Sequence, residues 1–243
     1  MRARPSFRDV LTHVRTVRPD IADPVEAIVE RRLLVDGVIV TNPSSLVRAD
    51  GAVVVRPARS LAGQRKLDAA IGSFRLDVAG ATCVDLGAAA GGFIRSLLIH
   101  GARHVYAVDV GFGQLRGSLR ADPRVTNLER TNLADAGRHL APSTRIDVVT
   151  ADLSFISLSD ALPQLQDLWL APDAVLLALV KPQFELGLDR PPTLRTELDR
   201  AFGKACRGAA AAGWHPLAGM RSPIRGSRGS EEYFLLATRR PIG

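Results

Sequence analysis

Beyond residue 65 the chain alternates between short apolar runs and longer amphipathic stretches. The apolar runs predict strands over Thr82–Leu86, Val105–Val110, Val125–Leu128, Ile146–Ala151, Ala174–Val180 and Glu232–Ala237. Helical spacing of apolar residues predicts helices over Gly92–His100, Gln114–Arg120, Leu158–Leu168 and Leu194–Ala212. Strands that alternate with helices form a mostly parallel sheet covered on both faces. We therefore predict an α/β fold with a doubly wound sheet, whose last strand runs antiparallel at or near one edge.

The first 56 residues follow another pattern. Apolar positions at helical spacing predict helices over Ser6–Val17 and Pro24–Leu33, and two short strands follow at Val38–Val40 and Ala52–Val55. Turn residues stand at Asp36-Gly37 and Asp50-Gly51. Residues 57–64 carry arginine, alanine and glycine without periodicity, as linkers do. The sequence thus divides into a small α+β module (1–56), a linker (57–64) and a larger α/β domain (65–243).

The most informative motif joins the first two strands of that domain. Asp85-Leu-Gly87 leads through three alanines to Gly91-Gly92 at the start of a helix. Glycines let the backbone turn tightly and lie close to a ligand, and the free N–H groups of the helix favour an anionic group. The next strand ends in Asp109, about 20 residues on, where an acid reaches ribose hydroxyls in doubly wound folds. This strand, glycine turn, helix, strand and acid are typical of a nucleotide-cofactor site.

The turn departs from the dinucleotide pattern Gly-x-Gly-x-x-Gly, because Ala89 stands at the second glycine position. Asp85 also places an acid two residues before Gly87. Two acids around a glycine turn suit a cofactor with a nucleoside, an ammonium and a carboxylate, which describes S-adenosylmethionine better than a pyrophosphate. A βαβ turn without any ligand remains the alternative, since a lone glycine motif is a weak signal.

Two further strand ends carry ionisable residues. Asp152 follows the fourth strand and Lys181 the fifth, and Pro182 prevents further strand pairing directly after Lys181. Ligands bind at the carboxyl ends of such strands, so both side chains are candidate site residues. Helix capping by Asp152 and a solvated charge at Lys181 are the alternatives. Only Lys66, Lys181 and Lys204 are lysines among 32 basic residues. Because this chain uses arginine at nearly every other basic position, its few lysines are candidates for a role that needs a compact amine.

Composition narrows the class of protein. A hydrophobic content of 46% over 243 residues is enough for a full core, and the net charge of +7 favours a polyanionic partner, nucleic acid before a membrane surface. The longest apolar run, Ala174–Val180, is too short to cross a bilayer. Cys83 and Cys206 indicate no disulfide framework, and the five histidines lack metal-ligand spacing. We expect a cytoplasmic protein that binds no metal.

Several blocks in order then point to one family. They are Asp85–Phe93, Tyr106–Leu115, Asp122–Val125, Glu129–Asn132, Ala151–Ser157, Val180–Glu185 and Ser222–Ile224. From Lys66 to Leu236 this series resembles the TlyA-type branch of the FtsJ-like rRNA 2′-O-methyltransferases, some of whose members are labelled haemolysins. The resemblance implies a class I S-adenosylmethionine-dependent methyltransferase fold joined to a small RNA-binding module of the S-four type. It also implies methylation of ribose 2′-hydroxyls in ribosomal RNA, with RNA or ribosomal subunits as the partner.

The resemblance also assigns residues. It implies a catalytic tetrad at Lys66, Asp152, Lys181 and Glu232, with Glu231 as the alternative to Glu232. Cofactor-binding residues implied by the motifs are Asp85, Gly87, Ala88, Gly91, Gly92, Phe93, Asp109, Asn132 and Asp152. Whether Lys181 would act as a neutral base or as a fixed charge stays open.

The resemblance to the family is weaker in the segments that would contact the substrate. The helix that relatives line with arginine carries Asp23, Glu26 and Glu30 here, so the RNA-binding module is degenerate. Leu61-Ala-Gly63 replaces a Ser-Arg-Gly sequence, and a glycine-rich stretch after Glu185 is replaced as well. Two alternatives therefore remain: a methyltransferase for a small molecule or peptide, and a non-catalytic RNA-binding or haemolysin-like protein. The RNA, the nucleotide and the oligomeric state are left open.

Overall fold

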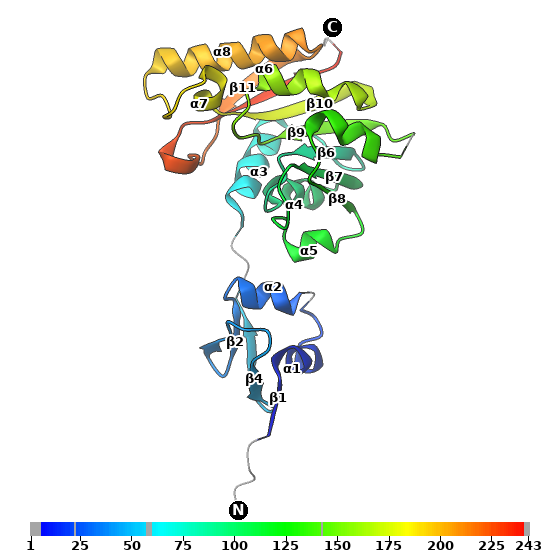
Figure 1. Cartoon of the computed structure of the whole chain (residues 1–243), viewed down its shortest axis with the longest axis vertical. Coiled ribbons are helices and arrows are strands. Elements are labelled where there is room, and N and C mark those ends of the chain that lie inside the picture. Colours follow the sequence, from blue (N-terminus) through cyan, green and yellow to red (C-terminus); the bar gives the residue numbers. More distant parts are fainter. Residues whose placement is uncertain (1–5, 22, 57–59, 142, 241–243) are drawn as a thin grey trace, which may run out of the picture. The chain divides into compact units, whose positions relative to one another are not determined.

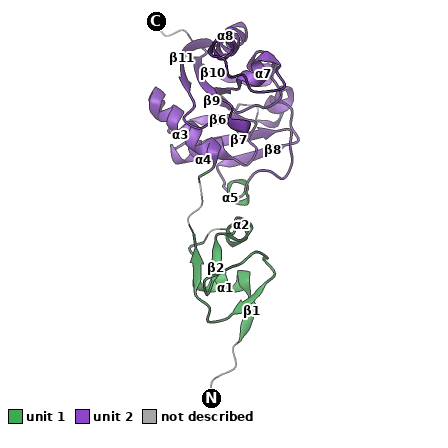
Figure 2. Ribbon diagram, turned by 90° about the vertical axis from the view of Figure 1, so that its left-hand side faces the viewer, with its two compact units in different colours: residues 1–60, 116–121 green, residues 61–115, 122–243 purple. Residues whose placement is uncertain are grey.

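A computed structural model of the chain describes residues 6–21, 23–56, 60–141 and 143–240 (Figure 1). The chain divides into two compact units, coloured separately in Figure 2. Unit 1 comprises residues 1–60 and 116–121, and unit 2 comprises residues 61–115 and 122–243. Each unit is described by itself below.

Unit 1 is a small α+β structure. Its elements are β1 (Phe7–Asp9), α1 (Val10–Val17), α2 (Pro24–Val29), β2 (Leu33–Val35), β3 (Val38–Ile39), β4 (Leu46–Arg48), β5 (Val53–Val55) and, from the second range, α5 (Gly117–Arg120). Strand β1 pairs with β4, and β2 lies between β3 and β5, all antiparallel. Buried residues of α1, α2 and β2 form its core, including Val10, Val14, Ile28 and Leu33.

The two helices predicted for this unit were wrong in their bounds, and some of its strands were missed. The first helix begins at Val10 and not at Ser6, because the Asp9 carboxylate accepts the Thr12 N–H at 3.0 Å and so caps the helix there. The second helix ends at Val29, and Leu33 begins strand β2 instead. Strands β1, β2 and β4 were not predicted, since three-residue strands show too little alternation to be recognised.

Unit 2 contains one large sheet. Its strands are β6 (Thr82–Leu86), β7 (His104–Asp109), β8 (Val125–Glu129), β9 (Ile146–Ala151), β10 (Leu170–Val180), β11 (His215–Arg221) and β12 (Tyr233–Thr238). The order is β11-β12-β10-β9-β6-β7-β8. Strands β6 to β10 run parallel, whereas β12 is antiparallel to both of its neighbours. The chain order reverses between β6 and β9, which is where ligands bind in open sheets of this type.

Helices cover both faces of the sheet. The helices of unit 2 are α3 (Ala62–Phe74), α4 (Gly92–Ile99), α6 (Leu158–Ala161), α7 (Pro182–Leu186) and α8 (Arg195–Ala211), with 3₁₀ turns at Leu133–His139, Leu162–Asp167 and Ser227–Gly229. Val84 and Leu86 on β6 share one buried cluster with residues of α6 and α8. Helices α3 and α4 pack on each other and contribute nothing to that cluster, so they lie on the opposite face (Figure 1).

The predicted α/β fold with a mostly parallel sheet is confirmed, as is an antiparallel last strand near one edge. Corrections are local. The helix expected over Gln114–Arg120 begins only at Gly117, and the one expected over Leu158–Leu168 continues past Ala161 as a 3₁₀ turn. Residues 62–64, expected in the linker, form the first turn of α3. Helices α3 and α7 and the edge strand β11 were not predicted.

Candidate active site

The glycine turn after β6 is built so that larger residues do not fit. Gly87 has a φ of +83°, and a Cβ there would lie 2.6 Å from the carbonyl oxygen of Asp152. Gly91 has a φ of +89° and caps the start of α4. A Cβ on Gly92 would lie 2.9 Å from the Cα of Gly63. Positive φ and these close approaches require glycine, so the turn brings bare backbone to the carboxyl end of β6.

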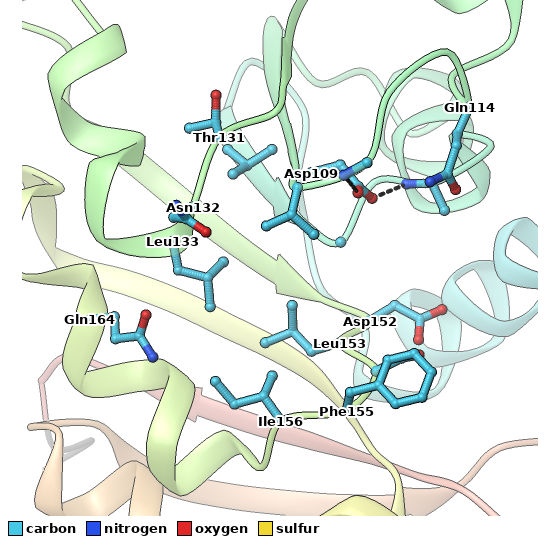
Figure 3. A pocket seen from close by; sticks show the side chains of 16 residues that line it. Asp109, Gln114, Thr131, Asn132, Leu133, Asp152, Leu153, Phe155, Ile156 and Gln164 are labelled. Atoms are coloured by element: carbon cyan, nitrogen blue, oxygen red, sulfur yellow. Dashed lines mark hydrogen bonds between the residues drawn. The ribbon is translucent and has the colours of Figure 1, made fainter.

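Asp109, at the end of β7, is held in place by the backbone. Its Oδ2 accepts the Ala89 N–H at 2.8 Å, and its Oδ1 accepts the Gly111 N–H at 2.6 Å (Figure 3). The carboxylate borders a cavity of about 490 Å³. Because each carboxylate oxygen can accept more than one hydrogen bond, Asp109 can still bind two hydroxyl groups.

This cavity, the nucleoside pocket, lies along the carboxyl ends of β6, β7, β8 and β9. Four of the predicted residues line it: Gly87, Asp109, Asn132 and Asp152. The sequence analysis assigned no role to its other lining residues, which are Ala89, Val108, Val110, Gly111, Gln114, Thr131, Leu133, Leu153, Ser154, Phe155, Ile156 and Gln164. In the view of Figure 3 apolar side chains such as Leu133 and Ile156 lie across the pocket from Asp109. Most of these residues lie within about five residues of the carboxyl end of a strand, so the strand-end rule could have found them.

A smaller cavity of about 160 Å³ shares Gly87, Ala89 and Asp152 with the nucleoside pocket. Predicted residues that line it are Asp85, Ala88, Gly92 and Phe93, whereas Gly91 lines neither cavity. Thr150 Oγ1 donates a 2.7 Å hydrogen bond to Oδ1 of the fully buried Asp85. Its Oδ2 has no hydrogen-bond partner within the described part of the chain. Burial raises the pKa of Asp85 to about 7, the nearby carboxylates of Asp152 and Asp109 add to the rise, and the Thr150 hydrogen bond opposes it.

The four residues of the implied tetrad form two ion pairs. Lys66 Nζ lies 2.6 Å from Glu232 Oε2, and both side chains are buried. Lys181 Nζ lies 2.7 Å from Asp152 Oδ1 and donates to Ser154 Oγ at 2.9 Å. Helix α3, the end of β9, the end of β10 and the start of β12 thus supply one member each. These contacts place all four side chains in the same region of unit 2.

Lys181 and Glu232 line a third cavity, here called the acceptor pocket, of about 160 Å³. It shares Ser154 and Phe155 with the nucleoside pocket, so the two are neighbours. Phe155 is 92% exposed, has a φ of +69° and packs against the ring of Phe184 at 5.3 Å between centroids.

Glu231 also borders the acceptor pocket but is bound differently. Its Oε1 lies 2.7 Å from Arg221 Nη2, at the surface. Glu232 is the buried glutamate and the partner of Lys66. A Cβ on Gly226 would collide with the Glu232 carboxylate, so the loop before β12 packs directly on that side chain. The geometry therefore favours Glu232 over Glu231 as the fourth member of the tetrad.

Within the described ranges, no three or more His, Cys, Asp or Glu side chains are grouped as metal ligands would be. No helix in the described part of the chain is both long and apolar enough to cross a bilayer.

Comparison with known proteins identifies the family of this chain. The profile of the FtsJ-like methyltransferases matches residues 62–239. The chain belongs to the FtsJ-like methyltransferase family. The match begins at the first residue of α3 and ends one residue after β12. It therefore spans both ion pairs and, except for Leu61, the lining of the three cavities of this methyltransferase.

The similarity to individual proteins is consistent with membership of this family. The chain is 41% identical over 225 residues to a Mycobacterium tuberculosis protein named 16S/23S rRNA (cytidine-2′-O)-methyltransferase TlyA, a match that covers 86% of this chain and 81% of the relative. It is 34% identical over 219 residues to Hemolysin A of Brachyspira hyodysenteriae, covering 83% and 86% of the two chains. A solved structure of a candidate hemolysin from Lactococcus lactis superimposes with a TM-score of 0.69 at 32% identity, over 74% of this chain and 88% of that one.

Proposed function

We propose that this protein transfers the methyl group of S-adenosylmethionine to a ribose 2′-hydroxyl of ribosomal RNA. The observation that carries the proposal is the acceptor pocket, where Lys181 and Glu232 stand beside the pocket that Asp109 borders. The relatives named as rRNA (cytidine-2′-O)-methyltransferases support the choice of acceptor.

The residues present fit the cofactor. The backbone-held carboxylate of Asp109 would accept hydrogen bonds from the ribose hydroxyls, and apolar side chains such as Leu133 and Ile156 would cover the base. The missing side chain at Gly87 lets the turn after β6 pack against the Asp152 carbonyl oxygen, which brings two strand ends together at the edge of the pocket. Asp85 borders the smaller cavity with an unpartnered carboxylate oxygen, which suits an ammonium group. When bound, S-adenosylmethionine would supply an electrophilic methyl group on a sulfonium.

The tetrad would act on the acceptor. Lys181 would contact the ribose hydroxyl, and the 2.7 Å ion pair to Asp152 would hold its amine in position. Glu232 would form part of the wall of the same pocket, where its buried ion pair with Lys66 fixes the carboxylate. Alignment of two reactants supplies about 7 to 11 kcal/mol of a barrier, so fixed side chains contribute by orientation as well as by proton transfer.

We also propose that residues 1–56 form the degenerate S-four-like RNA-binding module. The linker expected at 57–64 then ends before α3, because residues 62–64 belong to that helix and so to the methyltransferase domain. The separate core of unit 1, formed by residues such as Val14 and Ile28, supports an independent module. The first three residues of the linker, 57–59, lie outside the described residues.

The test supplies methyl-labelled S-adenosylmethionine together with purified ribosomal RNA, ribosomal subunits or a metabolite extract. We expect label in ribosomal RNA or subunits, and nucleoside digestion should recover it as a 2′-O-methylated nucleoside. The same incubation with Lys181→Ala serves as control and should leave RNA unlabelled. Label in the metabolite fraction alone, or on a base instead of a ribose, would contradict the proposal.

A further inference from the structure

Three arginines lie at the end of β11 and in the loop before β12, and two of them share one glutamate as partner. Arg221 and Arg225 both reach Glu231 Oε1, at 2.7 and 3.4 Å. The third, Arg228, is exposed and has no ion-pair or hydrogen-bond partner among the side chains that the structure describes. Of these three arginines, Arg228 is therefore the one whose guanidinium is open to a ligand without breaking a contact within the described part of the chain.

The backbone of the loop holds Arg228 in an unfavourable conformation. Gly226 and Ser230 close the turn through a 2.9 Å hydrogen bond from N–H to carbonyl, and Gly229 donates to Gly226 at 3.2 Å. Arg228 at the tip has a φ of +57°, in the left-handed region that residues with a side chain rarely adopt. Such strain persists where the surroundings impose it, and it is concentrated at functional sites.

Arg228 borders the acceptor pocket together with Lys181 and Glu232. In a polynucleotide the 2′-hydroxyl and the 3′-phosphate are on adjacent carbons of one ribose. A hydroxyl presented to Lys181 therefore brings a phosphodiester into the same small cavity. A planar guanidinium can bind two phosphate oxygens at once, which makes arginine well suited to that position.

We infer that Arg228 binds the phosphodiester on the 3′ side of the nucleotide that is methylated. The inference rests on the proposed function and narrows its substrate, because a free nucleoside or a 3′-terminal nucleotide lacks this group. The acceptor is then an internal nucleotide of an RNA chain. Arg228 acts as a positioning and specificity residue that contacts the substrate, while transfer itself depends on the tetrad.

The test measures initial rates of methyl transfer to ribosomal subunits at several salt concentrations. Arg228→Gln should raise the KM for subunits about tenfold to a hundredfold, as expected for a lost charge-assisted contact, with cofactor affinity unchanged. The dependence of log(kcat/KM) on log salt should become shallower by about 0.7 to 0.9, the value for one phosphate contact. Arg228→Lys should restore most of that slope, since lysine still neutralises a phosphate.

Arg200→Gln is the matched control, because it removes the same charge from an exposed residue of α8 that borders none of the three cavities. It should leave KM and slope near the wild-type values. An equal loss in Arg200→Gln, an unchanged Arg228→Gln, or failure of Arg228→Lys to restore the slope would overturn the contact. Wild-type protein that labels no RNA at all would instead overturn the proposed function, and the role of Arg228 with it.

Discussion

At the scale of single residues, Asp109 is the side chain on which cofactor binding should depend most. Two main-chain N–H groups already orient its carboxylate toward the nucleoside pocket. A hydrogen bond to a charged group contributes about 1.5 to 3 kcal/mol, so Asp109→Ala should weaken S-adenosylmethionine binding about tenfold to a hundredfold. Calorimetry measures this directly. Asp173→Ala, at an exposed position on β10, is the control. Unchanged affinity, or a preference for a nicotinamide dinucleotide, would show that the pocket is misassigned.

Lys181 should matter for transfer but not for the cofactor. It touches Asp152 and Ser154 and borders the acceptor pocket. Lys181→Ala should abolish methyl transfer while calorimetry shows nearly normal cofactor binding. Lys181→Arg should fail as well, because a guanidinium is wider and does not lose its proton. Transfer by the arginine variant would indicate a purely electrostatic role, and full activity of both variants would remove Lys181 from the mechanism.

Asp85 should make stability depend on pH in an unusual direction. Burial raises its pKa from 3.8 to about 7 in the folded protein. Between those values the folded state holds a proton that the unfolded state has lost, so the contribution of Asp85 to the free energy of unfolding falls as pH rises. In Asp85→Asn this contribution is absent. The difference in unfolding free energy between wild type and variant, from urea titrations at pH 4 to 7.5, should therefore shift in favour of the variant as pH rises. A difference that is constant with pH would show that Asp85 titrates at an ordinary value.

Residue-level reasoning from strand ends identified Asp85, Asp109, Asp152 and Lys181 without help from any relative, because buried parallel strands bring their carboxyl ends to one edge. It did not identify the Lys66–Glu232 pair, which the family resemblance implied. These two residues are 166 positions apart, and nothing local in the sequence connects them. Arg228 was not singled out either, since only the fold shows that it borders the acceptor pocket.

At the scale of elements, the glycine turn can be tested by contrasting two glycine-to-alanine changes. Gly87 has positive φ and a Cβ would meet the Asp152 carbonyl oxygen, whereas a Cβ on Gly72 in α3 would meet nothing within 4 Å. Gly87→Ala should lower the free energy of unfolding by about 1 to 3 kcal/mol. Gly72→Ala should raise it by about 0.5 to 1 kcal/mol, because alanine favours a helix. Urea unfolding measures both. A stabilising or neutral Gly87→Ala would mean that the turn is looser than described.

The elements that were predicted well differ physically from those that were not. Strands β6 and β9 were predicted with correct bounds because they are almost wholly buried and consist mostly of apolar residues. Strand β11 is mostly exposed and contains Pro216 and Gly219, which are unusual in strands. Helix α3 begins after Leu61 without a capping side chain, so its start carries no signal in the sequence. Tertiary packing, and not local preference, defines these elements.

At the scale of the whole molecule, the acids of unit 1 bear on where RNA binds. Asp23 caps α2 by accepting the Glu26 N–H at 2.8 Å, and Glu30 forms a 2.5 Å ion pair with Arg32. Asp23 and Glu30 therefore stabilise unit 1 itself through these contacts. Helix α2 nevertheless lacks the arginine side chains that the resemblance to the S-four type would lead us to expect. We expect residues 1–56 to bind RNA weakly by themselves.

A fragment that begins at residue 61 should then keep most of the salt dependence of RNA binding shown by the full chain. Each phosphate contact contributes about 0.7 to 0.9 to the slope of log affinity against log salt. Filter binding over a salt series compares the two proteins, and circular dichroism verifies that the fragment is folded. A fragment that loses the slope entirely would identify unit 1 as the RNA anchor despite its acids. Full-length protein without any salt-dependent RNA binding would favour a small-molecule or peptide acceptor.

The buried pair between Lys66 and Glu232 joins the first helix of unit 2 to its last strand. Asp85, Asp109 and Asp152 all precede β10, so the cofactor pocket can form earlier along the chain than the acceptor pocket. During synthesis, the ability to hold the methyl donor would therefore arise before the ability to use it. A chain clipped before β12 would keep an uncompensated buried lysine. Such a chain would sequester the donor without modifying any substrate, which separates the two capacities in time.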